Sequence, residues 1–227
     1  MTTTLPIEDV SAIPYHKIQS PFKRCVERGT PDYNKPLIGA WSAPEFAYLS
    51  TLQWRWTEKV DGTNVRVFWD GVQPQFFGRT DKAQLPSRLL AVLEEMFPEM
   101  LMEEVFGAKA VTLYGEGYGG KIQKGSNYRP DENFILFDVK IGRWWLDRDQ
   151  VNEVARSLLI ESVPEIGEPR SVWSAIEDVK SGVYSRVSRT HSDLVAEGLV
   201  GTPVVPLFNR AGERAIMKVK TRDFYQQ

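Results

Sequence analysis

An alternating segment interrupted by a turn restricts the fold of this chain more than any other feature. In residues 63–77, TNVRVFWDGVQPQFF, the apolar side chains of Val65, Val67 and Trp69 recur at every second position. This period is typical of a β-strand with one buried face. The Asp-Gly pair at 70–71 then favours a tight hairpin turn, and a second apolar run follows. The segment therefore predicts two antiparallel strands.

Helical and strand patterns follow one another along the rest of the chain without a regular strand–helix–strand alternation. Residues 85–107 predict a helix that is interrupted at Pro98, and Asp147 is placed to cap a later helix. This order favours the α+β class, with two mainly antiparallel sheets and flanking helices. The other expected strands lie in 110–119, 133–145, 197–210 and 214–225, and the other expected helices lie in 147–160 and 171–182.

Length and composition restrict the class of protein. The 227 residues suit one large domain, or one domain plus a small appendage. Six prolines in residues 1–50 predict an irregular lead-in with short elements. The single cysteine, Cys25, excludes an internal disulfide framework and a multi-cysteine zinc site. This cysteine usage favours a cytoplasmic location. The sequence shows neither a signal peptide nor an apolar run long enough to span a bilayer.

The charge balance bears on polyanion binding. A formal net charge of −2 gives no field of the whole protein that would attract nucleic acid, so a polyanion would have to bind a local basic patch. The basic side chains within residues 15–24 either form a solvated face or contact such a polyanion. Two more lysines follow a glycine-rich segment. The candidate contacts are Lys17, Lys23, Arg24, Lys121 and Lys124.

Lys59 has two possible roles that its local sequence leaves open. It lies in WTEKVDGTN, where a strand is expected to start, and the Asp-Gly pair at 61–62 follows it. It is either a surface residue at a strand edge or a nucleophile. A free lysine has a pKa of roughly 10.4, so it is almost fully protonated at pH 7 and needs desolvation or neighbouring cations to become reactive.

Four other places carry side chains suited to chemistry. In MKVK, period two places Lys218 and Lys220 on one strand face, where they would either share an anion or guard a solvated edge. Glu116 lies between glycines that permit close approach of a ligand, and this loop lacks the ending of a Walker loop. In FILFDV, alternation is expected to point Phe137 away from Asp138. Glu197 precedes a glycine and a strand, where it would cap, face solvent or hold a cation.

These motifs follow one another in a single order: EKVDGTN, GR at 78–79, YGEG, LFDV, EGLV and MKVK. In this order they resemble the motifs of the covalent nucleotidyltransferases, the superfamily of ATP-dependent ligases and messenger-RNA capping enzymes. The resemblance runs from about residue 55 to residue 222. It is strongest to the phage-type, nick-sealing RNA ligases, because of Asn64 and of GEGYGGKIQKG followed by FILFDV.

The resemblance implies a reaction and a set of roles. Lys59 would attack ATP and form a covalent lysyl-AMP, with Mg²⁺ or Mn²⁺ as cofactor. AMP would then pass to the 5′-phosphate of RNA or an RNA-containing duplex, and an adjacent 3′-hydroxyl would displace AMP and seal the strand. Matched by position, the implied ATP-binding residues are Glu58, Asn64, Arg79, Glu116, Phe137, Lys218 and Lys220, and the implied metal ligands are Glu197 and Asp138.

The resemblance also sets the expected domain organisation and the alternatives. We expect one adenylyltransferase domain over residues 1–227, without the C-terminal nucleic-acid-binding domain that related ligases usually append. The location would be cytoplasmic, in the host if the gene belongs to a phage. A minimal DNA ligase, or another polynucleotide adenylyltransferase using the same lysine, is the main alternative. A non-catalytic nucleic-acid-binding module is the third, and the GEGYGGKIQKG loop disfavours a capping enzyme.

Overall fold

The computed structural model describes residues 13–225, which form two compact units. The first unit comprises residues 13–16 and Gly62–Ser162, and the second comprises Lys17–Asp61 and residues 163–225. Each unit has its own hydrophobic core. The prediction of a single domain over residues 1–227 stays a prediction.

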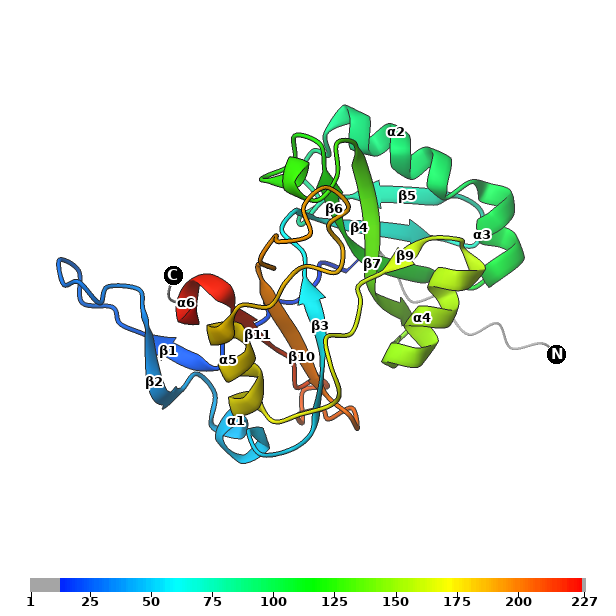
Figure 1. Cartoon of the computed structure of the whole chain (residues 1–227). Coiled ribbons are helices and arrows are strands. Elements are labelled where there is room, and N and C mark those ends of the chain that lie inside the picture. The colour runs from blue at the N-terminus through cyan, green and yellow to red at the C-terminus, as the bar shows by residue number, and fades with distance from the viewer. Residues whose placement is uncertain (1–12, 226–227) are drawn as a thin grey trace. The chain divides into compact units, whose positions relative to one another are not determined.

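The first unit is built on a six-stranded sheet with the order β5-β4-β6-β7-β8, and β9 pairs with β7 (Figure 1). All pairs in this sheet are antiparallel except β7 with β9. The hairpin predicted in residues 63–77 is confirmed, because β4 pairs with β5 across the turn that contains the Asp-Gly pair. The strands are β4 (Thr63–Trp69), β5 (Pro74–Phe77), β6 (Val111–Gly119), β7 (Glu132–Ile141), β8 (Trp144–Trp145) and β9 (Glu161–Ser162).

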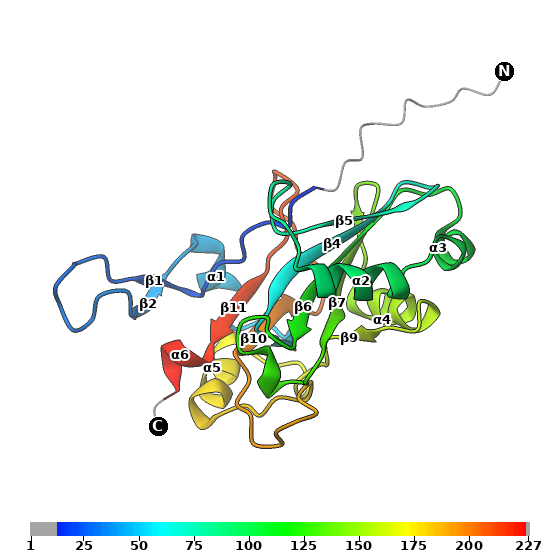
Figure 2. The same ribbon diagram turned by 90° about the horizontal axis from the view of Figure 1, so that it is seen from above.

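Three helices bury one face of this sheet. Side chains of α2 (Ser87–Met96), α3 (Glu99–Phe106) and α4 (Arg148–Ser157) pack into the same core as Val65 and Val67. Figure 2 shows the backbone of these helices beside the strands of the sheet. Two predictions are confirmed here. The proline at 98 separates α2 from α3, and the aspartate at 147 caps α4 in a capping box with Gln150. A short 3-10 turn, Gly125–Asn127, follows β6.

The second unit is built on a three-stranded antiparallel sheet with the order β11-β10-β3. One face of this sheet packs on α5 through buried residues such as Trp56, Ile176 and Val219. The α5 helix ends before Gly182, as the sequence predicts. The elements are β3 (Trp54–Lys59), β10 (Gly198–Pro203), β11 (Met217–Lys220), α5 (Val172–Ser181) and α6 (Thr221–Phe224).

The proline-rich part of this unit contains more regular structure than the lead-in prediction specified. A two-stranded antiparallel sheet joins β1 (Phe22–Arg24) to β2 (Pro36–Trp41), and α1 (Pro44–Leu49) follows. Prolines stand at the first positions of β2 and α1, where a missing backbone N–H is tolerated. Residues 1–12 of the predicted lead-in lie outside the described residues.

The position of Lys59 corrects one expectation. Lys59 ends β3 and does not begin a strand. The segment before it is itself a strand, because Trp54, Trp56 and Glu58 alternate inward and pair with β10. The sharp turn after Lys59 also has a physical reason at Gly62. A Cβ at this glycine would collide with the carbonyl oxygen of Gly117 in β6.

No helix among residues 13–225 is both long enough and apolar enough to cross a membrane.

Candidate functional site

Three lysines of the second unit project from the sheet face opposite its core. In the strand register, Lys59 of β3 and Lys220 of β11 both lie opposite Gly198 of β10. Lys218 lies one row away on the same face, while Met217 and Val219 are fully buried on the other face. The prediction that period two would place Lys218 and Lys220 together is therefore confirmed.

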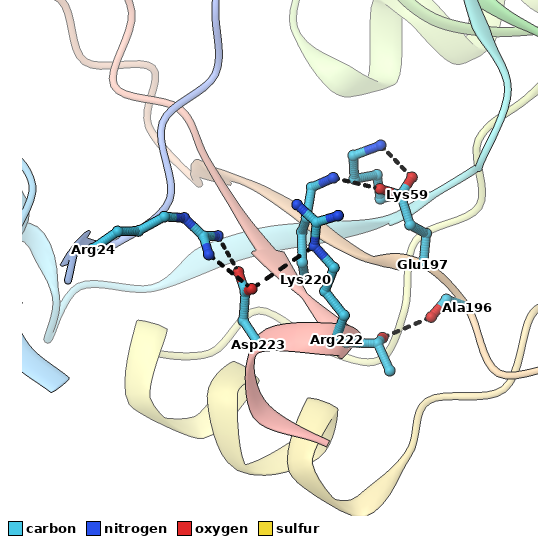
Figure 3. A network of polar contacts seen from close by, with 8 residues as sticks. Arg24, Lys59, Ala196, Glu197, Lys220, Arg222 and Asp223 are labelled. Carbon is cyan, nitrogen blue, oxygen red and sulfur yellow. Dashed lines mark hydrogen bonds and ion pairs between the residues drawn. The ribbon is translucent and has the colours of Figure 1, made fainter. Parts of the chain in front are cut away.

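Glu197 lies between two of these lysines and forms ion pairs with both (Figure 3). Its Oε2 accepts a hydrogen bond from Lys59 Nζ, and its Oε1 accepts one from Lys220 Nζ at 2.7 Å. The Lys59 and Glu197 side chains are each 21% exposed, so the cluster is largely shielded but still open to solvent. Since Gly198 has no side chain, nothing projects from β10 between Lys59 and Lys220.

Backbone contacts fix the segment that carries Glu197. The backbone N–H of Thr221 donates to the Glu197 carbonyl at 2.9 Å, and the Thr221 hydroxyl donates to the Ala196 carbonyl at 2.6 Å. A Cβ at Gly198 would lie 2.8 Å from the Lys220 Cα, so only glycine permits this close approach of β10 to β11. The carboxylate is thus held at a defined place between two cations.

The charges of this cluster shift two pKa values. Burial alone would raise the pKa of Glu197, but Lys59 and Lys220 outweigh burial and hold it below its usual value of 4.5. Burial lowers the pKa of Lys218 to about 8, and the nearby Lys220 and Lys59 cations add to this effect. A lysine with such a pKa loses its proton more readily than an ordinary lysine. Perturbed pKa values of this kind are common at functional sites.

Replacing Lys218 with methionine should raise the thermal midpoint of unfolding at pH 7. In the unfolded chain this lysine keeps its usual pKa of 10.5, whereas in the folded chain its pKa is about 8. The folded state therefore holds the charged form at a cost that is complete below pH 8 and disappears as the pH rises towards 10.5. The gain should accordingly shrink at pH 10. Thermal denaturation at both pH values measures it.

The matched control for this substitution is Lys23→Met, because Lys23 is exposed and lies outside the three-lysine cluster. Its midpoint should equal that of the wild type. If the Lys218→Met midpoint at pH 7 is equal to or below the wild-type value, the charge of Lys218 does not destabilise the folded state.

Glu58 faces the buried side of the same sheet and holds a turn. Its two carboxylate oxygens accept hydrogen bonds from the Ser185 hydroxyl at 2.5 Å and from the Arg186 backbone N–H at 2.7 Å. Burial raises its pKa above the usual value, although these hydrogen bonds act in the opposite direction. The carboxylate is therefore engaged within the unit, and the predicted contact of Glu58 with adenine stays a prediction.

In the first unit, two predicted residues face each other across β4 and β6. Asn64 pairs directly with Glu116, and both are half-buried on the sheet face opposite the helices. The Asn64 side-chain oxygen is buried and has no hydrogen-bond partner among the described residues. A buried amide oxygen without a partner is uncommon and marks a place where a ligand or water can donate a hydrogen bond.

Phe137 and Asp138 lie on the same face of β7, which corrects the expectation of opposite faces. In the register with β6, Asp138 pairs with Tyr114 while Leu136 pairs with Gly115, so Phe137 is the extra residue of a β-bulge. Tyr15 contacts both residues. Its hydroxyl donates to Asp138 at 2.8 Å, and its ring centroid lies 5.0 Å from that of Phe137.

The remaining predicted residues differ in whether their side chains already form contacts within the protein. Arg79 is exposed, and it makes no hydrogen bond or ion pair with the described residues. Arg24 is engaged by Asp223, with contacts of 2.5 and 3.1 Å to its two carboxylate oxygens (Figure 3). Its guanidinium is thus already used within the second unit. The other predicted nucleic-acid contacts are all exposed: Lys17, Lys23, Lys121 and Lys124.

Sequence reasoning missed the partners Tyr15, Ser185 and Asp223, since no local pattern marks them. The two predicted metal ligands, Glu197 and Asp138, belong to the second and the first unit respectively. Among residues 13–225, no group of three or more histidine, cysteine, aspartate or glutamate side chains could hold a metal ion.

The chain matches one protein family over most of its length. The family model described as RNA ligase matches residues 52–220. No curated protein matches the sequence significantly.

The fold is similar to that of solved structures of RNA ligase from Naegleria gruberi. A mutant with ATP and Mn superimposes with a TM-score of 0.61 at 15% identity, covering 79% of this chain and 54% of that one. The enzyme with pyrophosphate gives a TM-score of 0.60 at 16% identity, with coverages of 79% and 52%. A mutant with AMP and Mn gives 0.61 at 15% identity, with the same coverages. The chain spans about half the length of these ligases.

Proposed function

Because the chain belongs to the RNA ligase family, we propose that it is an ATP-dependent RNA ligase that forms a covalent lysyl-AMP on Lys59. We further propose that it is of the phage-type, nick-sealing kind, which acts on RNA or RNA-containing duplexes with 5′-phosphate and 3′-hydroxyl ends. The observation that carries the proposal is the set of three lysines gathered around Glu197 on one sheet face. ATP with Mn in the similar solved structures supports the choice of nucleotide and cofactor.

The lysine cluster suits a triphosphate. Lys218 and Lys220 project from the same side of β11, so one polyanion can contact both ammonium groups. They would bind the phosphate oxygens and stabilise the charge that develops on pyrophosphate as it leaves. Lys218 binds phosphate best when it is protonated, so nucleotide binding should weaken as the pH rises through the Lys218 pKa of about 8.

The first step forms one bond and breaks one. The Lys59 amine gives up a proton, its nitrogen attacks the α-phosphorus, and the bond between the α- and β-phosphates breaks to release pyrophosphate. Lys59 is placed for this role because it is largely shielded yet lies on the polar face of its sheet. Its ion pair with Glu197 must open before the amine can react.

The residues present fit a divalent cation of the kind that phosphate-transferring enzymes use. Mg²⁺ is usually held by one or two carboxylates together with substrate phosphates and water, and not by a complete protein cage. Glu197 supplies one carboxylate beside the phosphate-binding lysines. When bound, such a cation would neutralise charge on the triphosphate. Asp138 is the second proposed ligand, and its Oδ2 accepts a hydrogen bond from the Tyr15 hydroxyl.

The residues of the first unit would bind the nucleoside and a phosphate. In this proposal Glu116 accepts hydrogen bonds from the ribose hydroxyls, and the unpartnered oxygen of Asn64 accepts one from a ligand or a bound water. Phe137 stacks on adenine, and the unengaged guanidinium of Arg79 binds a phosphate. The match of these positions to the family motifs supports these roles, as do the exposed side chain of Arg79 and the unpartnered oxygen of Asn64.

Two further steps complete the proposed reaction. An oxygen of the 5′-phosphate attacks the phosphorus of lysyl-AMP, the phosphorus–nitrogen bond breaks, and Lys59 regains its amine. The 3′-hydroxyl then attacks the activated 5′-phosphate and AMP leaves, so that one phosphodiester bond joins the strands. Exposed Lys17, Lys23, Lys121 and Lys124 are the proposed phosphate contacts. Each neutralised phosphate would add to the salt dependence of binding.

Phe137→Ala should weaken ATP binding by roughly 1–3 kcal/mol, the usual contribution of one aromatic ring stacked on a base. Isothermal titration with ATP measures the affinity. Because Phe137 also packs on Tyr15, the thermal midpoint must be recorded in parallel. Tyr15→Phe is the matched control, since it keeps the ring and removes the hydroxyl that donates to Asp138. Wild-type ATP affinity in a folded Phe137→Ala protein would assign Phe137 to packing alone.

The experiment that tests the function as a whole is strand sealing. The protein is incubated with ATP, Mg²⁺ or Mn²⁺, and a labelled 5′-phosphate strand placed at a nick in RNA, DNA or hybrid duplexes. We expect joined product at nicks in RNA-containing duplexes and a strict need for ATP. Sealing of DNA nicks alone would favour the alternative of a minimal DNA ligase. Absence of joined or adenylylated strands on every substrate would contradict the proposal.

A further inference from the structure

A fully buried arginine in the first unit is not explained by the proposed roles. Arg66 lies in the middle of β4 and has no exposed surface, and it occupies the sheet face of Asn64 rather than that of the hydrophobic core. Burying a guanidinium costs several kcal/mol unless it is paired and hydrogen-bonded. The contacts of Arg66 therefore indicate which part of the structure the buried guanidinium stabilises.

Arg66 contacts the end of β5 and the turn that follows it. Arg66 Nε donates to the carbonyl oxygen of Gly78 at 3.0 Å, and Nη2 contacts Asp81 Oδ1 at 2.8 Å. The guanidinium carbon also lies 5.3 Å from the centroid of the Phe77 ring, within the range of a cation–π contact. The two ends of the turn at 78–81 are thus fastened to one planar group.

The fastened turn carries Arg79 between its two anchor points. Gly78 is buried and packs closely, since a Cβ at this position would lie 2.9 Å from the Ala83 Cβ. Arg79 itself is exposed and makes no hydrogen bond or ion pair with any described residue. The chain therefore fixes the backbone on both sides of Arg79 and leaves its guanidinium available.

We propose that Arg66 is a positioning residue that holds the 78–81 turn so that Arg79 can bind a nucleotide phosphate. This inference rests on the proposed function of Arg79 and adds a residue that the motif match does not include. The planar guanidinium is needed because it donates in two directions at once, to a backbone carbonyl and to a carboxylate. A lysine at position 66 would keep the charge and lose this geometry.

A double-mutant cycle tests the coupling between the two arginines. The variants are Arg66→Lys, Arg79→Ala and the double variant, and the readouts are kcat and KM for ATP in self-adenylylation. Arg66→Lys should raise KM by on the order of tenfold, the size of effect expected when one charged hydrogen bond is lost. In the Arg79→Ala background it should change KM less than about twofold, because the guanidinium that it positions is absent.

A second readout does not depend on nucleotide chemistry. An arginine-specific protease cleaves after Arg79 only when the turn opens, giving fragments 1–79 and 80–227 that mass spectrometry identifies. Arg66→Lys should speed this cleavage, and Asp81→Asn should speed it less, because Asp81 is 72% exposed and its ion pair is weak. Lys82→Met is the matched control and should cleave like the wild type, since Lys82 is an exposed neighbour that makes none of these contacts.

The two readouts separate the possible failures. If the wild type forms no lysyl-AMP, the proposed function is wrong, and the protease still decides whether Arg66 holds the turn. Unchanged cleavage in Arg66→Lys and Asp81→Asn would overturn the inference. Faster cleavage together with an equal loss of activity in both Arg79 backgrounds would also overturn it, because Arg66 would then have only a structural role.

Discussion

Lys59→Ala should abolish covalent transfer of AMP to the protein and leave the fold intact. The side chain ends β3 on the polar face of its sheet, so it adds little to the hydrophobic core. Glu197 keeps its other ion pair, the one with Lys220, when Lys59 is removed. Incubation with α-labelled ATP followed by denaturing electrophoresis measures the transfer, and thermal denaturation confirms folding.

Lys59→Arg is the matched control for charge. Arginine can keep an ion pair with Glu197, but its guanidinium stays protonated and cannot attack phosphorus. This variant should fold like the wild type and should also form no AMP adduct. An adduct on either Lys59 variant would show that another residue is the nucleophile.

Glu197→Ala should lower both stability and activity. It leaves Lys59, Lys218 and Lys220 together on one sheet face without the carboxylate that lies between two of them. Removing one partner of a largely buried ion pair is destabilising, because the remaining charges lose their compensation. Self-adenylylation should fall by on the order of 10²–10³-fold, the usual effect of removing one electrostatic group from an active site. Thermal midpoints and adenylylation rates measure the two effects.

Two conditions sharpen this prediction. Inorganic pyrophosphate should raise the midpoint of Glu197→Ala more than that of the wild type, because an anion can replace the missing carboxylate. The stability difference between the two proteins should shrink as the pH falls through the lowered pKa of Glu197, since protonation removes its charge in the wild type as well. Equal midpoints and equal rates at pH 7 would contradict the assigned role of Glu197.

Local patterns in the sequence predicted much of the fold. The alternation in 63–69 and the Asp-Gly pair predicted the β4–β5 hairpin, and the two-residue period of MKVK predicted the shared face of Lys218 and Lys220. The capping aspartate and the helix ends at Pro98 and Gly182 were also predicted correctly. In each case, the residues that determine the structure lie close together in the sequence.

Features that depend on distant partners were not predicted. The bulge at Phe137 exists because β7 has one more residue than the strand of β6 that pairs with it, and alternation within β7 alone cannot show this. The inward orientation of the Glu58 side chain depends on a hydrogen bond from Ser185, which lies 127 residues away in the sequence. The wrong placement of Lys59 at a strand start has the same origin, since β3 is recognisable mainly through its pairing with β10.

The candidate site was predicted at the level of residue type and order. Motif order brought Lys59, Glu197 and Lys220 to attention, and the structure places these three in direct contact. The residues that position the motif side chains carry no motif of their own. Arg66 was visible only as a polar position of an alternating strand, and Tyr15 lies in a segment without any periodic pattern.

The most direct test of the central claim is to locate the nucleotide on the protein. The wild type is incubated with ATP and Mg²⁺, digested, and mapped by mass spectrometry. We expect a single AMP adduct, on the peptide that contains Lys59, and we expect it to disappear when a nicked RNA duplex with a 5′-phosphate is added. An adduct on Lys218 or Lys220, or a wild-type protein that carries no AMP, would contradict the account.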